Sequence, residues 1–433
     1  MAFPTIVYDA VGGSDTAASG AGPATAVTGI AGATTGADTA GISNTVIKLN
    51  GSPDLSGVTV DVDVLWLDHT AGTRHLHRIT AVDDTLKTVT VEDAVTIANA
   101  SAVAWAIGGK RKTLENDTTA VDGNDGKAGW TFEFNDGTYT QTIAMNPQAG
   151  DTTDGPVTYK ATNRHSAIID KTGAFRNWYF QTSASAVVID GLKFTRSSGT
   201  SGGAHVIYVN TSNIIITFIN NEVDGAGTDG AMYLNAFVHL YAYNNEFYGV
   251  DYAGTNTGGI RLGNRVHAII ENNSFHDLDT PAIWEAASTS YSHSTIRGNT
   301  IYNCEDGITV DGVSGTGASM VIEDNTINGC TGSGIDILDV SVGTGSGLVI
   351  RGNTITNNTT YGIKNTTGFA HGVKYNDYNN VWNNTVANYL NLTAGANSIS
   401  ADPLYINTTA GFENFTPDNG SPSIGLVPSG PIN

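Results

Sequence analysis

The sequence has few basic residues and almost no cysteine. It contains 20 Lys and Arg against 41 Asp and Glu, which gives a formal net charge of −21 over 433 residues. Proteins that bind nucleic acid present positive charge to the phosphates, so this balance excludes such a surface over most of the molecule. Two cysteines cannot form a disulfide framework, and nothing in the sequence requires an oxidising compartment.

Long apolar runs are also missing. No stretch of about 18 apolar residues could serve as a membrane span. The N-terminus, MAFPTIVY, has neither the basic start nor the apolar core of a signal peptide. We therefore expect synthesis in the cytoplasm, with no export signal and no membrane segment.

The most informative feature that is present is a repeat between residues 218 and 355. Six blocks of the type Ile-Glu-Asn-Asn-Ser-Phe or Ile-Arg-Gly-Asn-Thr-Ile occur in register, and successive blocks are 24, 28, 26, 26 and 28 residues apart. The fixed position in the blocks is held by Asn221, Asn245, Asn273, Asn299, Asn325 and Asn353. A repeat of this length is typical of a solenoid, in which each unit buries its apolar face only against its neighbours.

The residues around each fixed Asn predict strands. In one block Ile322, Asn325 and Ile327 follow strand periodicity, and the runs between blocks are short and rich in Gly, Asn, Thr and Asp. Successive strands must then stack in parallel, about 4.8 Å apart. We expect each Asn to point inward at a bend and to bond the same Asn above and below, since buried polar groups need partners.

On these blocks the chain resembles the right-handed parallel β-helix superfamily, the pectate-lyase-like fold, over roughly residues 130 to 425. The segment from Trp105 to Leu114 and the later Trp130 to Tyr139 also resemble the junction of bacteriophage virion β-helix proteins, as does the Ser14–Pro23 stretch. The implied fold class is all-β: a right-handed parallel β-helix solenoid preceded by a small antiparallel β-domain and an extended N-terminal arm.

The expected domain organisation has five parts. Residues 1–45 form a low-complexity arm, either a flexible tail or a segment that becomes ordered against a partner, and residues 46–115 form the antiparallel β-domain for attachment or oligomerisation. Residues 116–129 form a linker, 130–400 the parallel β-helix and 401–433 a C-terminal cap over the open end of the last coil.

Two further columns follow from the repeat. Five residues after each ladder Asn, an inward column holds Val250, Leu278, Cys304 and Cys330, which predicts stacked, buried, free thiols. Two residues before the ladder Asn, an outward column alternates in charge and predicts a surface charge ladder that fixes register: Glu271, Arg297, Glu323 and Arg351.

A third, outward stripe is the candidate for ligand binding. Alignment of the strands at Ile260, Ile283, Ile308, Ile335 and Ile363 brings together Arg261, Trp284, Thr309, Asp336 and Lys364, with Tyr233 from the preceding coil. Aromatic faces and charged groups in a line suit a glycan, so Tyr233, Arg261, Trp284 and Asp336 are the glycan-binding candidates.

Catalytic candidates are Asp279, Glu305 and Asp306, together with Arg261. Paired carboxylates serve glycoside hydrolysis, and an acidic cluster with Ca²⁺ and a basic residue serves the β-elimination of pectate-lyase-type enzymes. The chain departs from the lyase pattern, because it lacks that family's combination of a calcium-binding Asp cluster with an Arg-containing motif. Many outward carboxylates are also expected where turns favour Asp. We expect no metal and no cofactor, with Ca²⁺ only if the chain is a lyase.

Three classes of function remain. The first, which we favour, is a non-enzymatic bacteriophage virion protein. Within this class we favour a head decoration over a tail fibre or spike. It would be a homotrimer held to other virion proteins by the arm and β-domain, with no nucleic-acid or membrane partner. The second is a tailspike-type polysaccharide lyase or glycoside hydrolase acting on a host surface glycan. The third is a non-catalytic glycan-binding adhesin.

Overall fold

The computed structural model describes residues 5–8, 10, 27–28, 43–49, 54–61, 63–70, 73–96, 104–107 and 110–111 of the N-terminal part. It then describes 128–141, 155–172, 176–180, 186–198, 205–235, 237–251, 258–286, 292–311, 318–339, 347–366, 373–409, 411 and 413–426. The chain divides into two compact units, one of residues 1–172 and 177–197 and one of 173–176 and 198–433. Among the residues described, none lies in a helix long and apolar enough to cross a membrane.

The N-terminal part of the first unit contains a small antiparallel sheet. The sheet has the order β2 (Val27–Thr28), β7 (Ala104–Ile107), β4 (Val64–Thr70), β5 (Thr73–Asp83), β6 (Thr88–Thr96) and β3 (Ser43–Lys48). Its buried core is aliphatic: Ile47, Leu49, Leu55, Leu65, Ile79, Val89, Val91 and Ile107. This confirms the small antiparallel β-domain expected from the alternating pattern.

The first unit also contains the early strands of the solenoid. They are β9 (Thr131–Phe134), β10 (Gly137–Gln141), β11 (Val157–Ala161), β12 (Ala167–Thr172), β13 (Trp178–Phe180), β14 (Ala186–Asp190) and β15 (Lys193–Ser198). Aromatic rings fill the interior of these coils. Phe132 stacks on Tyr159 with 4.9 Å between ring centroids, and Trp178 contacts Phe194 edge-on at 5.0 Å.

A strand near the N-terminus covers the first edge of the solenoid. β1 (Thr5–Tyr8) pairs in parallel with β9 on one side and with β8 (Lys110–Arg111) on the other. Tyr8 is buried against Phe134, with 4.8 Å between ring centroids, and its carbonyl accepts a hydrogen bond from the Tyr139 hydroxyl at 2.9 Å. The sequence did not predict this contact. The rest of the predicted arm lies outside the described residues, apart from Ala10, β2 and the start of β3.

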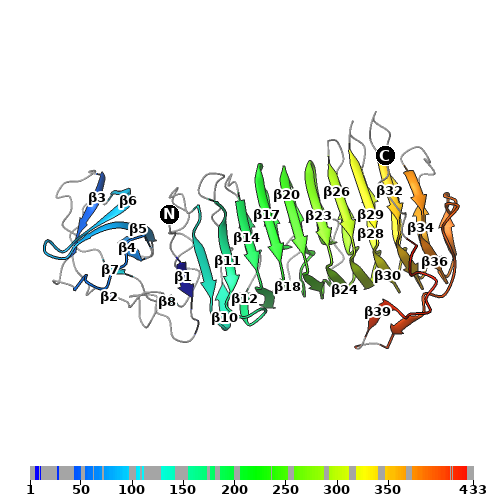
Figure 1. Cartoon of the computed structure of the whole chain (residues 1–433), viewed down its shortest axis with the longest axis horizontal. Helices are drawn as coiled ribbons and strands as arrows, with labels where there is room; N and C mark the ends of the chain where they lie inside the picture. Colours follow the sequence, from blue (N-terminus) through cyan, green and yellow to red (C-terminus); the bar gives the residue numbers. More distant parts are fainter. Residues whose placement is uncertain are drawn as a thin grey trace. The chain divides into compact units, whose positions relative to one another are not determined.

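The second unit winds through three parallel sheets, whose strands follow one another in Figure 1. Sheet A contains β17 (Ile214–Ile219), β20 (Val238–Tyr243), β23 (Val266–Glu271), β26 (His293–Arg297), β29 (Ser319–Glu323), β32 (Gly347–Arg351) and β35 (Val373–Asp377). Sheet B contains β18 (Glu222–Asp224), β21 (Glu246–Tyr248), β24 (Ser274–Leu278), β27 (Thr300–Cys304), β30 (Thr326–Asn328), β33 (Thr354–Thr356) and β36 (Asn380–Trp382).

Sheet C contains β16 (His205–Val209), β19 (Gly230–Leu234), β22 (Gly258–Leu262), β25 (Ile283–Glu285), β28 (Ile308–Asp311), β31 (Ile335–Asp339), β34 (Tyr361–Asn365) and β37 (Ala387–Leu390). Counted along the sequence, the solenoid makes about eight turns between residues 131 and 390. The fold class predicted from the repeat is therefore confirmed.

The predicted asparagine ladder is present at the bend between sheets A and B. The Oδ1 atom of Asn299 accepts hydrogen bonds from the backbone N and the Nδ2 of Asn273, at 2.9 and 3.0 Å, and Asn299 repeats this pattern with Asn325. Each Nδ2 from Asn245 on also donates to a backbone carbonyl, as Asn299 does to Ile270 at 2.9 Å. All six predicted residues take part, and Asn379 adds a seventh that the sequence did not predict.

The sharp bend explains which residue types precede each ladder Asn. That residue has positive φ on every coil, for example 54° at Asn244, 64° at Gly298 and 54° at Asp324. Left-handed backbone is accessible to Gly and tolerated by Asn and Asp, which is why these types alternate there. At Gly298 a side chain would also collide, because an added Cβ would lie 2.6 Å from Oδ1 of Asn272.

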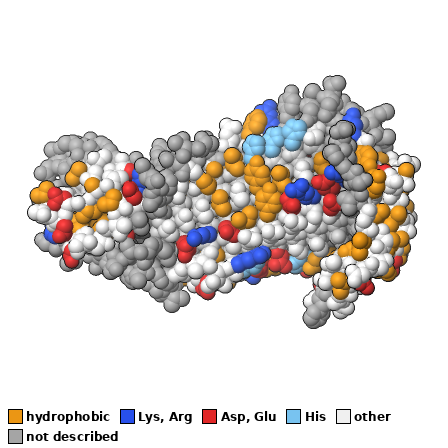
Figure 2. All heavy atoms as spheres, in the orientation of Figure 1, with side chains coloured by type: hydrophobic (Ala, Val, Ile, Leu, Met, Phe, Trp, Pro, Cys, Tyr) orange, Lys and Arg blue, Asp and Glu red, His pale blue; other side chains and the backbone are white. Residues whose placement is uncertain are grey.

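The other two predicted columns are also found. Cys304 and Cys330 are buried and free, and burial raises the pKa of both thiols. The charged column is in register on sheet A, where Arg297 lies 2.8 Å from Glu271 and Nε of Arg351 lies 2.7 Å from Glu323. On the same sheet, four residues before the charged column, His239, His267 and His293 stack with 4.9 and 5.1 Å between ring centroids (Figure 2, pale blue).

The C-terminal segment does more than cover the end of the last coil. Residues 391–400 cover that end, where Asp377 accepts hydrogen bonds from the backbone N and Nδ2 of Asn397, both at 2.8 Å. After them, β38 (Tyr405–Asn407) and β39 (Asn414–Pro417) form an antiparallel hairpin. The hairpin folds back along the outer side of sheet B, with Phe415 5.1 Å from the ring of Tyr302. Aromatic contact with an earlier coil explains why the predicted cap continues along the side.

Replacing one ladder amide with an apolar group of similar size should destabilise the fold. We expect Asn299→Leu to lower the free energy of unfolding by about 1–3 kcal/mol, because the two buried donors of Asn273 and the carbonyl of Ile270 lose their partners. Chemical denaturation measures the change, with Thr295→Leu on the outer face of sheet A as the control. Equal stability of the two variants would contradict the ladder's role.

The cover over the first edge should be equally measurable. Tyr8→Ala should cost about 3–5 kcal/mol, the usual cost of truncating a buried aromatic side chain, since Tyr8 is 1% exposed among aromatic rings. Deleting residues 1–8 should in addition expose the edge of β9 and cause aggregation, measurable by light scattering during thermal unfolding. A deletion variant that unfolds like the full chain and stays monodisperse would show that β1 is dispensable.

Candidate functional site

The outward stripe predicted on sheet C is in register. Tyr233 pairs with Arg261, Arg261 with Trp284, Trp284 with Thr309, Thr309 with Asp336, and Asp336 with Lys364. Tyr208 extends the column by one coil, because it pairs with Tyr233. We call the column of Tyr208, Tyr233, Arg261, Trp284, Thr309, Asp336 and Lys364 the outer ladder. Tyr208 could have been found from the match between His-Val-Ile-Tyr-Val and Gly-Ala-Met-Tyr-Leu.

Arginine and aromatic rings alternate along the first half of the outer ladder. The guanidinium carbon of Arg261 lies 4.5 Å from the ring centroid of Tyr233 and 4.8 Å from that of Trp284. Arg176 lies over Tyr208 at 4.1 Å, and Tyr208 is 5.2 Å from Tyr233. Cation–π contacts of this kind stabilise a partly desolvated guanidinium. Burial nevertheless lowers the pKa of Arg261 from its usual value.

From Thr309 on, the outer ladder contains polar and charged side chains in place of aromatic rings and arginine. Arg261 covers one face of the Trp284 ring, and the next residue in register on the other side is the short Thr309. Within the described residues, Nε1 of Trp284 and Oγ1 of Thr309 are buried and have no hydrogen-bond partner. Beyond Thr309, Asp336 accepts hydrogen bonds from Nζ of Lys364 at 2.8 Å and from the Thr366 hydroxyl at 3.0 Å. Thr309 and Asp336 are 3% and 5% exposed, so a buried hydroxyl separates the indole from the ion pair in this column.

The predicted acidic residues come together at the turn between sheets B and C. Burial and the charge of Asp279 raise the pKa of Glu305. Burial, with smaller effects of Asp336 and Glu305, raises the pKa of Asp306 to about 6, although the backbone N–H of Ser333 donates to it at 2.6 Å. Asp279 and Glu305 are exposed, whereas Asp306 is partly buried.

The residues of this region can be compared with what acid catalysis, metal binding and ligand binding each require. A carboxyl group with a pKa near 6 can act as a general acid, so Asp306 has one property that glycoside hydrolysis needs. In the part of the chain that the structure describes, no group of three or more His, Cys, Asp or Glu is placed to hold a metal ion. The outer ladder itself offers aromatic and hydrogen-bonding groups for binding.

Two further titratable clusters lie away from the outward face of the outer ladder. Glu285 follows Trp284 and points inward, where it is 1% exposed and bonded to the hydroxyl of Ser294 at 3.2 Å. On sheet B, His276 bonds Glu246 and Asp277, both at 2.9 Å, and its pKa is raised by these bonds despite burial. The alternation of β25 already places Glu285 inward.

The buried carboxyl of Glu285 predicts a specific dependence of stability on pH. Burial raises its pKa to about 8, from 4.5 in the unfolded chain, so the folded protein keeps a proton that the unfolded chain releases. Stability from this group is full below pH 4.5 and falls as pH rises toward 8, by up to about 1.4 kcal/mol per pH unit.

Glu285→Gln, which is neutral at every pH, should remove this loss. Melting temperatures between pH 5 and 8 measure it: the variant should gain on the natural protein as pH rises. Parallel curves for the two proteins would mean that Glu285 is ionised in the fold.

Comparison with known proteins agrees with the fold. Residues 205–388 match the family model described as "Right handed beta helix region". No curated protein matches the chain.

Several solved structures are similar to parts of this chain. An alginate lyase from Paenibacillus sp. str. FPU-7 is 12% identical, with a TM-score of 0.46, covering 66% of this chain and 97% of the lyase. The A-module of the mannuronan C-5 epimerase AlgE4 of Azotobacter vinelandii is 12% identical, with a TM-score of 0.37, covering 66% and 95%. The catalytic domain of a GH87 α-1,3-glucanase is 12% identical, with a TM-score of 0.29, covering 87% and 90%. All three TM-scores lie below 0.5, so these likenesses carry no argument about this chain.

Proposed function

We propose that this chain is a non-enzymatic structural β-helix that binds a glycan along the outer ladder. The observation that carries the proposal is the order of groups in that ladder: an indole with one face on Arg261 and the other toward the small Thr309, followed by Asp336. A sugar ring presents C–H groups on its faces and hydroxyls on its edges. It would stack on the face of Trp284 that is turned toward Thr309, while its hydroxyls bond Thr309 and Asp336.

Binding without cleavage is the form of this proposal that the residues favour. The guanidinium of Arg261 is held between two aromatic rings, and one oxygen of Asp306 is engaged by the backbone of Ser333. A general acid or base must come within hydrogen-bond distance of the proton that it transfers, and one oxygen of Asp306 already has another partner. These contacts instead suit a rigid binding surface.

The proposed setting is a bacteriophage particle, as the resemblance of the N-terminal sequence implies. A projecting surface protein needs stiffness, and the continuous ladder of buried amides supplies it. In this proposal the N-terminal part attaches the chain to other virion proteins as a homotrimer, and the particle is decorated on its head.

A second candidate function is a tailspike-type polysaccharide lyase or glycoside hydrolase. The raised pKa of Asp306, close to Glu305 and Asp279, is the observation that favours it. It differs from the first candidate in requiring turnover and in depending on the carboxylates.

Binding and cleavage can be separated in one experiment. The purified chain is incubated with a panel of bacterial surface polysaccharides and polyuronates, with and without Ca²⁺, and both retention and released oligosaccharides are measured. We expect retention of at least one glycan without release. Trp284→Ala should weaken retention at least tenfold, while Tyr241→Ala on sheet A should not.

The outcomes divide the candidates. Released oligosaccharides that disappear in Asp306→Asn would establish the enzymatic alternative and overturn the proposal. Retention that is equal in the Trp284 and Tyr241 variants would remove the outer ladder as the binding surface.

A further inference from the structure

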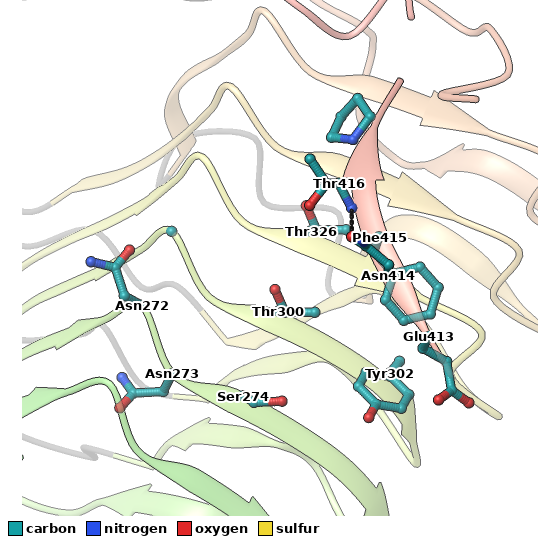
Figure 3. Close-up of a pocket in the computed structure, with 12 residues that line it drawn as sticks. Asn272, Asn273, Ser274, Thr300, Tyr302, Thr326, Glu413, Asn414, Phe415 and Thr416 are labelled. Atoms are coloured by element: carbon teal, nitrogen blue, oxygen red, sulfur yellow. Dashed lines mark hydrogen bonds between the residues drawn. The ribbon is translucent and has the colours of Figure 1, made fainter. Parts of the chain in front are cut away.

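A groove lies on a different face of the second unit from the outer ladder, between the C-terminal hairpin and sheet B. It has a volume of about 460 Å³ and is bounded by β24, β27 and β30 on one side and by the Glu413–Pro417 segment on the other (Figure 3). A groove of this size falls within the range that holds small ligands in proteins. It shares no residue with the outer ladder, which runs along sheet C.

The hairpin is anchored at points that leave the groove open. Phe415 is 7% exposed and rests on Tyr302, and the Tyr405 hydroxyl bonds the Thr356 hydroxyl at 3.0 Å. Nearer the chain end, Nδ2 of Asn380 donates to the carbonyl of Ala401 at 2.8 Å and to the Ser423 hydroxyl at 2.7 Å. These contacts hold β39 beside the sheet, so the groove has a fixed second wall.

The floor of the groove is a row of hydroxyl groups. Ser274, Thr300 and Thr326 are in register on successive coils of sheet B, so their side chains repeat at the spacing between parallel strands, about 4.8 Å. The structure gives none of these three hydroxyls a hydrogen bond to another described residue. They are therefore available to a ligand that extends along the solenoid.

The end of the groove combines an aromatic surface with a donor and an acceptor. Tyr302 and Phe415 lie with 5.1 Å between their ring centroids, and Figure 3 shows Glu413 beside Tyr302. Burial, with the negative charge of Glu413 as the next cause, raises the pKa of Tyr302 to about 12, so its hydroxyl is a hydrogen-bond donor at neutral pH. The Glu413 carboxylate is an acceptor.

The charges of the groove select against ionic ligands. Among its twelve lining residues Glu413 is the only charged one, and no Lys or Arg is present to bind a carboxylate, sulfate or phosphate. Amides from Asn272 and Asn414 add further donors and acceptors. An uncharged ligand with many hydroxyls, spaced along an extended chain, fits this chemistry.

From this geometry we infer a second carbohydrate site: the groove between β39 and sheet B binds a neutral oligosaccharide along the Ser274–Thr300–Thr326 row, with its end against Tyr302 and Phe415. The inference does not rest on glycan binding at the outer ladder. The two sites lie on different sheets and are lined by different residues, so each can fail alone.

Calorimetric titration of the full chain with maltotetraose, cellotetraose and laminaritetraose tests the inference, with a trigalacturonate and a Thr- and Val-containing pentapeptide as competing ligand classes. The test variant is Thr300→Val with Tyr302→Phe, which removes two hydroxyls and keeps both shapes. The matched control, Thr295→Val with Tyr243→Phe, makes the same changes on the outer face of sheet A. Trp284→Ala reports on the outer ladder.

We expect at least one neutral tetrasaccharide to bind, with affinity reduced at least fivefold in the groove variant and unchanged in the control and in Trp284→Ala. No binding of any tetrasaccharide, or binding that the groove variant leaves intact, overturns the inference. Preferential binding of the pentapeptide would overturn it as well, and would identify β39 as an edge that accepts a peptide strand. Loss in Trp284→Ala alone would assign the binding to the outer ladder.

Discussion

The hydrogen bond between ladder asparagines is the interaction on which the rest of the solenoid depends. From Asn245 on, each Oδ1 accepts from both the backbone N and the Nδ2 of the Asn on the preceding coil. From Asn245 on, the same Nδ2 also satisfies a carbonyl inside the bend, for instance that of Phe218. A turn that would leave backbone groups buried without partners is thereby closed, and its rotation relative to the next coil is fixed.

Fixed register at this bend has consequences on all three sheets. Because a shift by one residue moves every side chain to the opposite face, the ladder determines which residues stack on the outside. It aligns the ion pairs of Glu271 with Arg297 on sheet A and the hydroxyl row on sheet B. On sheet C it places Arg261 between Tyr233 and Trp284. The register that the asparagine ladder fixes therefore aligns the residues of both candidate binding surfaces.

The features that recur on every coil could be predicted from the sequence. Six ladder positions, the charged column and the stripe from Tyr233 to Lys364 follow from the spacing of the Asn blocks. Asn379 was missed because Tyr378 occupies the left-handed position before it, with φ of 56°, where the other coils have Asn, Asp or Gly. Two contacts have no local pattern at all. β1 pairs with a strand more than a hundred residues away. The hairpin that forms one wall of the groove contacts a coil much earlier in the sequence, through Phe415 and Tyr302.

Hydrogen–deuterium exchange at residue resolution tests the central claim most directly, because the ladder makes each Asn backbone amide a donor to a buried side chain. The amides of Asn245, Asn273 and Asn299 should exchange as slowly as those of the adjoining strands of sheets A and B. Exchange at these positions as fast as in solvent-exposed turns would show that the side-chain ladder does not persist in solution. Register would then have to be fixed by the apolar interior alone.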